Sequence, residues 1–281
     1  MSDYVSKPSF HFAVTAAEWA LPNAPVLLRC DTRHQFEQAK KLGYDAIELH
    51  LRTPEDVPAS DLTALQKEFG VRVSAVATGL SKLIDQLCFI DPQAAIRTAA
   101  VKRILSFVDW AAEVGCAIIL GSMRGNLPEG EQRTQAERWM RESLNEIVQY
   151  AKSKSVTILL EVINRYENNY LNTAAETVAY VESFDSPFLK VHLDTFHMNI
   201  EEADMIEAIR TTGAQHLGYI HFADNNRHAC GEGALDFSAI LNALNDIGYT
   251  GYASVECLCI PDGYSAAKNS LGHLNSLIEQ N

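Results

Sequence analysis

The sequence has no excess of basic residues: 23 Lys and Arg stand against 36 Asp and Glu, a formal net charge of −13. A nucleic-acid backbone needs a basic patch, so this balance argues against a nucleic-acid partner. No run of about 18 apolar residues occurs, which argues against a membrane-spanning helix. The first residues carry neither the basic segment nor the apolar core of a secretory signal, so we expect a cytoplasmic protein.

The six cysteines form no pattern typical of a disulfide framework. A chain of 281 residues can bury a sufficient core without disulfides, particularly with 47% hydrophobic residues. Cys257 and Cys259 are close enough to resemble half of a soft-metal site, but no second cysteine pair accompanies them. We therefore expect reduced thiols and no structural zinc.

The chain also lacks a linker rich in Pro, Gly or Ser and the Gly-rich phosphate loops of open α/β folds. Instead, short β-like runs alternate with segments of helical period. This alternation implies a parallel sheet, and eight strand–helix units favour a closed (β/α)8 TIM barrel in a single domain, residues 1–281. The expected strands are 9–15, 46–51, 71–78, 117–121, 156–163, 188–193, 216–222 and 252–256; the expected helices are roughly 31–42, 60–69, 92–114, 131–153, 173–184, 201–212, 237–247 and 264–279.

Four consecutive expected strands have a carboxylate or an imidazole near their ends. Because side chains alternate between the two faces of a strand, all four point inward at the barrel end where TIM-barrel active sites lie. Burying three carboxylates together without a cation is costly. Oxygen ligands with one imidazole suit a hard divalent cation, Mn²⁺ first, with Mg²⁺ or Co²⁺ as alternatives. The four residues are Glu161, Asp194, His221 and Glu256.

Other polar residues lie near the same strand ends. Glu48 and His50 end the second expected strand with inward parity, and we expect them to line a substrate pocket. His192 lies one layer deeper than the aspartate of its strand, so we expect it behind the metal ligands. Arg52 and Arg124 follow strand ends and are candidates for binding a substrate carboxylate with two hydrogen bonds. The alternative for each arginine is a surface or salt-bridged position.

The second half of the chain carries motifs that resemble a known family. From about Val156 to the C-terminus, LLEVINRYENNYLNT, HLDTFHMNIEE, IHFADNNRHACGEGALDF and YASVECL are similar to the metal-dependent ketose 3-epimerases, such as D-tagatose and D-psicose 3-epimerases, of the xylose isomerase-like TIM barrels. The resemblance implies the same four metal ligands that strand parity selects. It also implies a homo-oligomer, a dimer or tetramer, and substrate contacts by Glu167, His197 and Arg227.

The first half fits that family less closely. Known epimerases of free ketoses carry aromatic residues near the end of the first strand, where this chain reads FHFAVTAAEWALPNAPVLLRC. The segments LRTPEDV, AVATGLSKLIDQLCF and IILGSMRG are more similar to the branch that acts on keto-sugar acids, such as 5-keto-gluconate epimerase. We expect these segments to line the substrate pocket, so they should determine which sugar or sugar acid is bound.

The predicted activity is that of an isomerase (EC 5.1.3.-) that inverts a carbon next to the ketone of a ketose or keto-sugar acid. The hydrogen on that carbon is weakly acidic, so its removal needs a base and stabilisation of a metal-bound enediolate. Inversion also needs an acid on the opposite face. Glu161 and Glu256 come from different strands and can flank the substrate, so they are the predicted catalytic pair, while Asp194 and His221 act mainly as ligands.

Three alternatives use the same fold. An aldose–ketose isomerase would share the metal site but move the proton between adjacent carbons on one face. A DNA-repair endonuclease with three metals needs more His and Asp ligands and a DNA-binding surface, which the charge of the chain disfavours. A non-catalytic sugar-binding barrel would not need both flanking glutamates.

Overall fold

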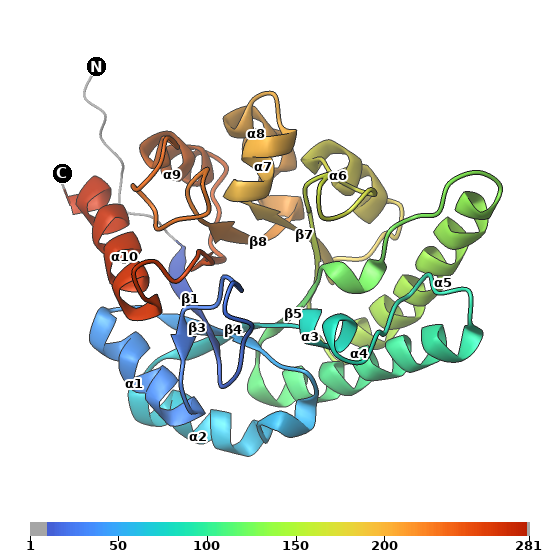
Figure 1. Ribbon diagram of the computed structural model, residues 1–281, viewed down its shortest axis with the longest axis horizontal. Coiled ribbons are helices and arrows are strands. Elements are labelled where there is room, and N and C mark those ends of the chain that lie inside the picture. The colour runs from blue at the N-terminus through green and yellow to red at the C-terminus, as the bar shows by residue number, and fades with distance from the viewer. Residues whose placement is uncertain (1–9, 280–281) are drawn as a thin grey trace.

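In the computed structural model, which describes residues 10–279, eight parallel strands form the predicted closed barrel (Figure 1). The ring closes because β1 pairs with both β3 and β9. A two-residue strand, β2 (Leu28–Arg29), pairs with the end of β1. Residue 9, where the first strand was expected to begin, lies outside the described residues. The barrel strands are β1 (His11–Ala17), β3 (Ala46–His50), β4 (Arg72–Ala77), β5 (Ala117–Leu120), β6 (Ile158–Glu161), β7 (Leu189–Asp194), β8 (Leu217–Phe222) and β9 (Tyr252–Val255).

Helices surround the strands, and their ends follow local capping signals (Figure 1). The Asp31 side chain accepts a hydrogen bond from His34 N, and Gly43 ends that helix with a left-handed φ of 94°. No helix within residues 10–279 is long and apolar enough to cross a membrane. The outer helices are α1 (Thr32–Leu42), α2 (Ala59–Phe69), α4 (Ala94–Val114), α5 (Gln132–Ser153), α6 (Ala174–Glu182), α8 (Met205–His216), α9 (Phe237–Asp246) and α10 (Gly263–Glu279).

Two short helices follow strand ends and were not predicted: α3 (Gly79–Leu83) after β4 and α7 (Thr195–Glu201) after β7. The expected helix over 201–212 was wrong in its start, because α7 ends at Glu201 and α8 begins at Met205. Two separate aspartates cap these helices. Asp194 accepts from the backbone of α7, and Asp204 accepts from that of α8.

The interior of the barrel changes character along its axis. Below the carboxyl ends of the strands, apolar side chains fill the interior, among them Ala75, Leu159 and Tyr219. At the carboxyl ends of the strands, buried polar groups take their place. The parallel ladders shift register just before Glu48 on β3 and just before His192 on β7, and such irregularities re-aim side chains. The polar layer therefore lies on a packed apolar base.

Candidate metal and substrate site

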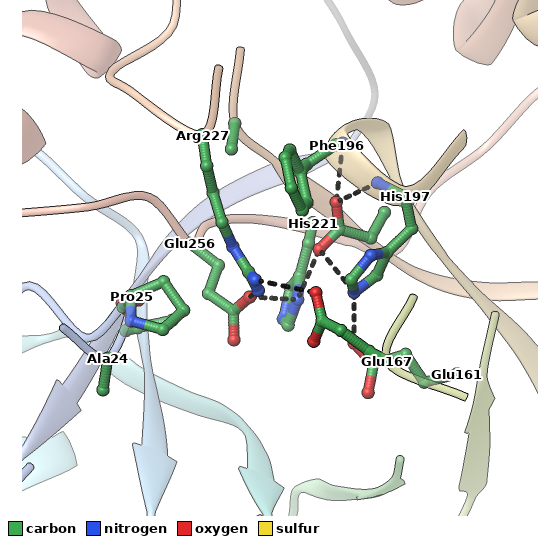
Figure 2. A network of polar contacts seen from close by, with 12 residues as sticks. Ala24, Pro25, Glu161, Glu167, Phe196, His197, His221, Arg227 and Glu256 are labelled. Atoms are coloured by element: carbon green, nitrogen blue, oxygen red, sulfur yellow. Dashed lines mark hydrogen bonds and ion pairs between the residues drawn. The ribbon is translucent and has the colours of Figure 1, made fainter. Parts of the chain in front are cut away.

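The four residues predicted as metal ligands meet at the carboxyl end of the barrel, from β6, β7, β8 and the residue after β9. His221 Nδ1 lies 3.7 Å from Asp194 Oδ2 and 3.6 Å from Glu256 Oε2. Glu161 joins them through His197, whose Nε2 lies 4.0 Å from Glu161 Oε1 and 3.9 Å from Asp194 Oδ2. Figure 2 shows the side chains of Glu161, His197, His221 and Glu256 pointing toward one another.

Two atoms in this group have no hydrogen-bond partner among the described residues. Asp194 Oδ1 accepts from the backbone N of Phe196 (2.7 Å) and of His197 (3.2 Å), which fixes the carboxylate at the start of α7. Asp194 Oδ2 and His221 Nδ1 are buried and accept or donate no hydrogen bond, although they lie 3.7 Å from each other. A buried polar atom without a partner costs about 1–3 kcal/mol. A divalent cation held here would remove that cost. The groups whose ligand atoms lie within 4.8 Å of one another are Glu48, His221 and Glu256; Glu161, Asp194 and His197; and Glu161, His192 and His221. Carboxylate oxygens with imidazole nitrogens fit such an ion.

Glu48 is fully buried behind His221. It is not one of the described residues that line the cavity next to the proposed ligands. Its Oε2 is 2.7 Å from His221 Nε2 and its Oε1 is 3.1 Å from His50 Nε2. Burial acts to raise the pKa of Glu48, but His221 and His50 lower it well below its usual range. The carboxylate therefore holds the His221 ring with Nδ1 toward the other ligands, as second carboxylates do at metal-binding histidines. His50 does line the cavity.

Glu161 is the carboxyl group of the cluster whose pKa is raised. Burial raises its pKa to about 8; Glu256 and Asp194 add to the rise and His221 opposes it. The three carboxylates therefore repel one another, and a bound cation would relieve this repulsion. Gly121 makes room for the carboxylate, because a Cβ at that position would lie 2.2 Å from Glu161 Oε2.

Three of the four proposed ligands, all but Asp194, line a cavity of about 250 Å³, to which Glu167, His197 and Arg227 also contribute. Arg227 Nη2 is 2.9 Å from Glu256 Oε2, and Nη1 is 3.4 Å from Glu167 Oε1. The guanidinium also stacks on Phe196, 4.8 Å from the ring centre. Arg227 adopts a left-handed φ of 61°, held by hydrogen bonds from its own N to Asp224 O and from Leu258 N to its carbonyl. The structure thus positions this arginine tightly.

His197 is oriented by a residue that the sequence reasoning missed. Asn164 Nδ2 lies 2.7 Å from His197 Nδ1 and 3.2 Å from Glu167 Oε1. An amide nitrogen donates, so His197 Nδ1 accepts and the proton sits on Nε2, facing Glu161 and Asp194. Burial lowers the pKa of His197, which keeps the ring neutral. The available signal was the position of Asn164, a polar residue shortly after a buried strand.

The structure does not bring Arg52 or Arg124 to the cavity lining formed by the described residues. Arg52 Nε lies 3.0 Å from Asp85 Oδ1, and the same aspartate also pairs with Arg103. Arg124 is fully buried and donates to the backbone carbonyl of Glu161. Burial lowers the Arg124 pKa to about 10. The geometry therefore supports the salt-bridged alternative for Arg52, whereas Arg124 takes a core position that neither interpretation included.

His192 lies where strand parity placed it, one layer below the ligands. The ring is fully buried and stands edge-on to His221, with ring centres 4.1 Å apart. Burial lowers the pKa of His192 well below its usual range. It therefore packs as a neutral ring beneath the cluster.

The sequence and the fold both match known epimerases. A family model described as "Xylose isomerase-like TIM barrel" matches residues 36–277. A ketose 3-epimerase of Arthrobacter globiformis is 33% identical over 223 residues, covering 78% of this chain and 75% of that protein. A D-psicose 3-epimerase of Agrobacterium fabrum is 33% identical over 260 residues, covering 89% and 84%.

A solved structure of L-ribulose 3-epimerase has a TM-score of 0.80 to this chain at 27% identity, covering 96% of this chain and 95% of that one. The match therefore extends over both halves, including the first half, whose motifs fit less closely. The chain belongs to the ketose 3-epimerase family of the xylose isomerase-like TIM barrels, which confirms the predicted fold and the predicted class of isomerase.

Proposed function

We propose that the chain inverts a carbon next to the ketone of a ketose, with a divalent cation held by Glu161, Asp194, His221 and Glu256. The observation that carries this proposal is the pair of buried atoms without a hydrogen bond, Asp194 Oδ2 and His221 Nδ1, which lie 3.7 Å apart next to further carboxylates. Mn²⁺ is the proposed ion, and Mg²⁺ or Co²⁺ also suits these donors. When bound, the ion acts as a Lewis acid on the ketone and its neighbouring hydroxyl.

Glu161 and Glu256 are the proposed proton carriers. They come from β6 and from the end of β9, and Figure 2 shows them on either side of His221. A carboxylate on one face of the reacting carbon takes its proton, and a carboxyl group on the other face returns one. Arg227 holds Glu256 in place at 2.9 Å, and Gly121 leaves the space that Glu161 needs.

His197 and Arg227 are the proposed substrate-binding groups. His197 presents its Nε2–H to the cavity, where it can donate to a sugar oxygen. Both Nη atoms of Arg227 already contact carboxylates, Glu256 and Glu167. This pairing supports a neutral ketose rather than a keto-sugar acid as substrate, because a further carboxylate would meet a guanidinium that is already neutralised.

The test is exchange of the hydrogen on the reacting carbon in deuterated buffer with Mn²⁺ added. Glu161→Gln and Glu256→Gln should each lower the rate by about 10²- to 10⁴-fold. Glu146→Gln, an exposed site on α5, is the matched control and should keep the wild-type rate. Undiminished deuterium uptake in either active-site variant contradicts the two-carboxylate assignment, and an aldose product would favour the isomerase alternative.

The predicted homo-oligomer and the cytoplasmic location stay proposals for this chain. Elemental analysis of the purified protein tests the cation: about one Mn per chain is expected, and its replacement by zinc alone would contradict the proposed preference.

A further inference from the structure

A second cavity, of about 460 Å³, adjoins the catalytic cavity on the side of β4, β5 and β6. We call it the distal cavity. The two cavities share three lining residues, Ser122, Ile163 and Glu167. Sites that enclose drug-sized ligands measure roughly 300–1,000 Å³. The catalytic cavity lies below that range and the distal cavity within it, so a single small sugar fills the first and leaves the second free.

The wall of the distal cavity is preformed, because hydrogen bonds join the three loops that form it. Phe89 N, after β4, donates to Met123 O, after β5, at 3.0 Å. Asn168 Nδ2, after β6, donates to Gly125 O at 2.7 Å. Asn169 N donates to Asn126 Oδ1 at 3.0 Å. Loops tied in this way hold a preformed wall, which lowers the ordering cost of binding.

The lining of the distal cavity suits a neutral sugar ring. Cys88, Ile90, Pro92 and Ile163 offer apolar surface for the face of a ring, and Ser122 and Asn126 offer polar groups to its hydroxyls. The charged groups do not favour an anion, because a single lysine faces two carboxylates: Lys82 against Asp91 and Glu167.

We propose that the distal cavity is a glycosyl subsite, so that the substrate is a ketose carrying a second neutral sugar ring on the carbons far from its ketone. This inference rests on the proposed function. With the ketone end at the ligand cluster of β6 to β9, the carbons far from the ketone can reach the wall that the two cavities share at Ser122, Ile163 and Glu167. Glu167 is 48% exposed and stands at the shared wall.

The first experiment compares D-fructose with isomaltulose, which carries a glucosyl group on the far end of a fructose unit. Hydrogen exchange at the carbon next to the ketone is followed in deuterated buffer with Mn²⁺. We expect kcat/KM for isomaltulose to exceed that for D-fructose by about tenfold or more, the effect of about 1.4 kcal/mol of added binding. Equal or slower exchange of isomaltulose overturns the subsite and leaves the proposed function standing. No exchange with D-fructose, D-psicose, D-tagatose or isomaltulose overturns both.

The second experiment narrows the distal cavity with Lys82→Trp. Lys82 lies on α3, is partly exposed, has no ion pair among the described residues, and does not line the catalytic cavity. The variant should lose about tenfold in kcat/KM on the glycosylated ketose while D-fructose stays within about twofold. Lys102→Trp, on the exposed face of α4, is the control and should change neither. An equal loss on both sugars, or no loss on either, overturns the proposal.

Discussion

The two halves of the barrel contribute different things to the cavity. Strands β6 to β9 end in the carboxylates and the imidazole that we propose to bind the cation and move protons, among them Glu161, His221 and Glu256. The loops after β1, β4 and β5 contribute small or apolar residues, such as Pro25 and Gly79. The proposed chemistry therefore lies in one half of the barrel, and the other half shapes the space around the substrate.

The division is not complete, because the first half also positions groups of the second. Glu48 on β3 holds the His221 ring at 2.7 Å. Gly121 after β5 leaves the space for the Glu161 carboxylate. If these two positions act as described, changes in the first half will alter metal binding and catalysis without touching a ligand. The experiments at Gly121 and Glu48 below test that dependence, and wild-type behaviour of both variants would show that the two halves are independent.

The largest effect is expected from Gly121→Ala. The added Cβ would lie 2.2 Å from Glu161 Oε2, so the carboxylate must move. A displacement of about 1 Å at a reacting group can cost about 100-fold, and we expect kcat/KM for deuterium exchange to fall by about that factor. Gly272→Ala, where a Cβ meets nothing within 4 Å, is the control. A wild-type rate in the Gly121 variant would show that the first half does not position Glu161.

Metal binding should raise the free energy of unfolding. At a free Mn²⁺ concentration 100 times its Kd, the gain is about 2.7 kcal/mol, measured by urea unfolding with and without a chelator. Asp194→Asn should lose most of this gain, although asparagine still caps α7. Asp236→Asn, at the N-cap of α9, is the matched control and should keep it. Identical unfolding curves with and without metal would contradict the site.

Glu48→Gln should weaken Mn²⁺ binding by about 10- to 100-fold, because it removes the charge that orients His221. Calorimetric titration measures the affinity, and saturating metal should restore most of the exchange rate. Glu113→Gln, an exposed position on α4, serves as the control. Unchanged affinity in Glu48→Gln would mean that the ligand half holds the cation without support from β3.

The smallest effect is expected from Phe196→Leu. The ring lies under the Arg227 guanidinium at 4.8 Å, a contact worth about 0.5–1 kcal/mol. We expect KM to rise about two- to fivefold with little change in kcat. Phe69→Leu removes a similar contact with Arg33 on the surface and should leave KM unchanged. A larger fall in kcat than in affinity would place Phe196 closer to the reacting carbon than the present geometry does.

Strand parity was sufficient to group the ligands, because the alternation of side chains is a local property of an extended chain. Asp194 and His221 each occupy an inward position near a strand end, and the order of parallel strands brings such ends together. Capping was local too: Thr173 and Glu176 form the capping box that their spacing indicates. These features need no knowledge of distant contacts.

The arginines could not be placed in this way. Arg52 and Arg124 follow strand ends just as the ligands do, yet one pairs with Asp85 and the other is enclosed in the core. Their partners come from loops whose paths depend on packing. Asn164 was missed for the same reason, since its bond to His197 joins the loop after β6 to α7.

The sequence by itself determined the barrel, its inward carboxylates and imidazoles, and the family to which the chain belongs. Hydrophobic periodicity, helix capping and motif spacing are local features, because each depends on residues within one strand or one turn. The tertiary structure alone decided which groups are free to meet a substrate. It placed Glu48 behind His221, removed two arginines from the cavity and opened the distal cavity between three loops. Those outcomes depend on the joint packing of segments that are far apart in the chain, and no local pattern carries that information.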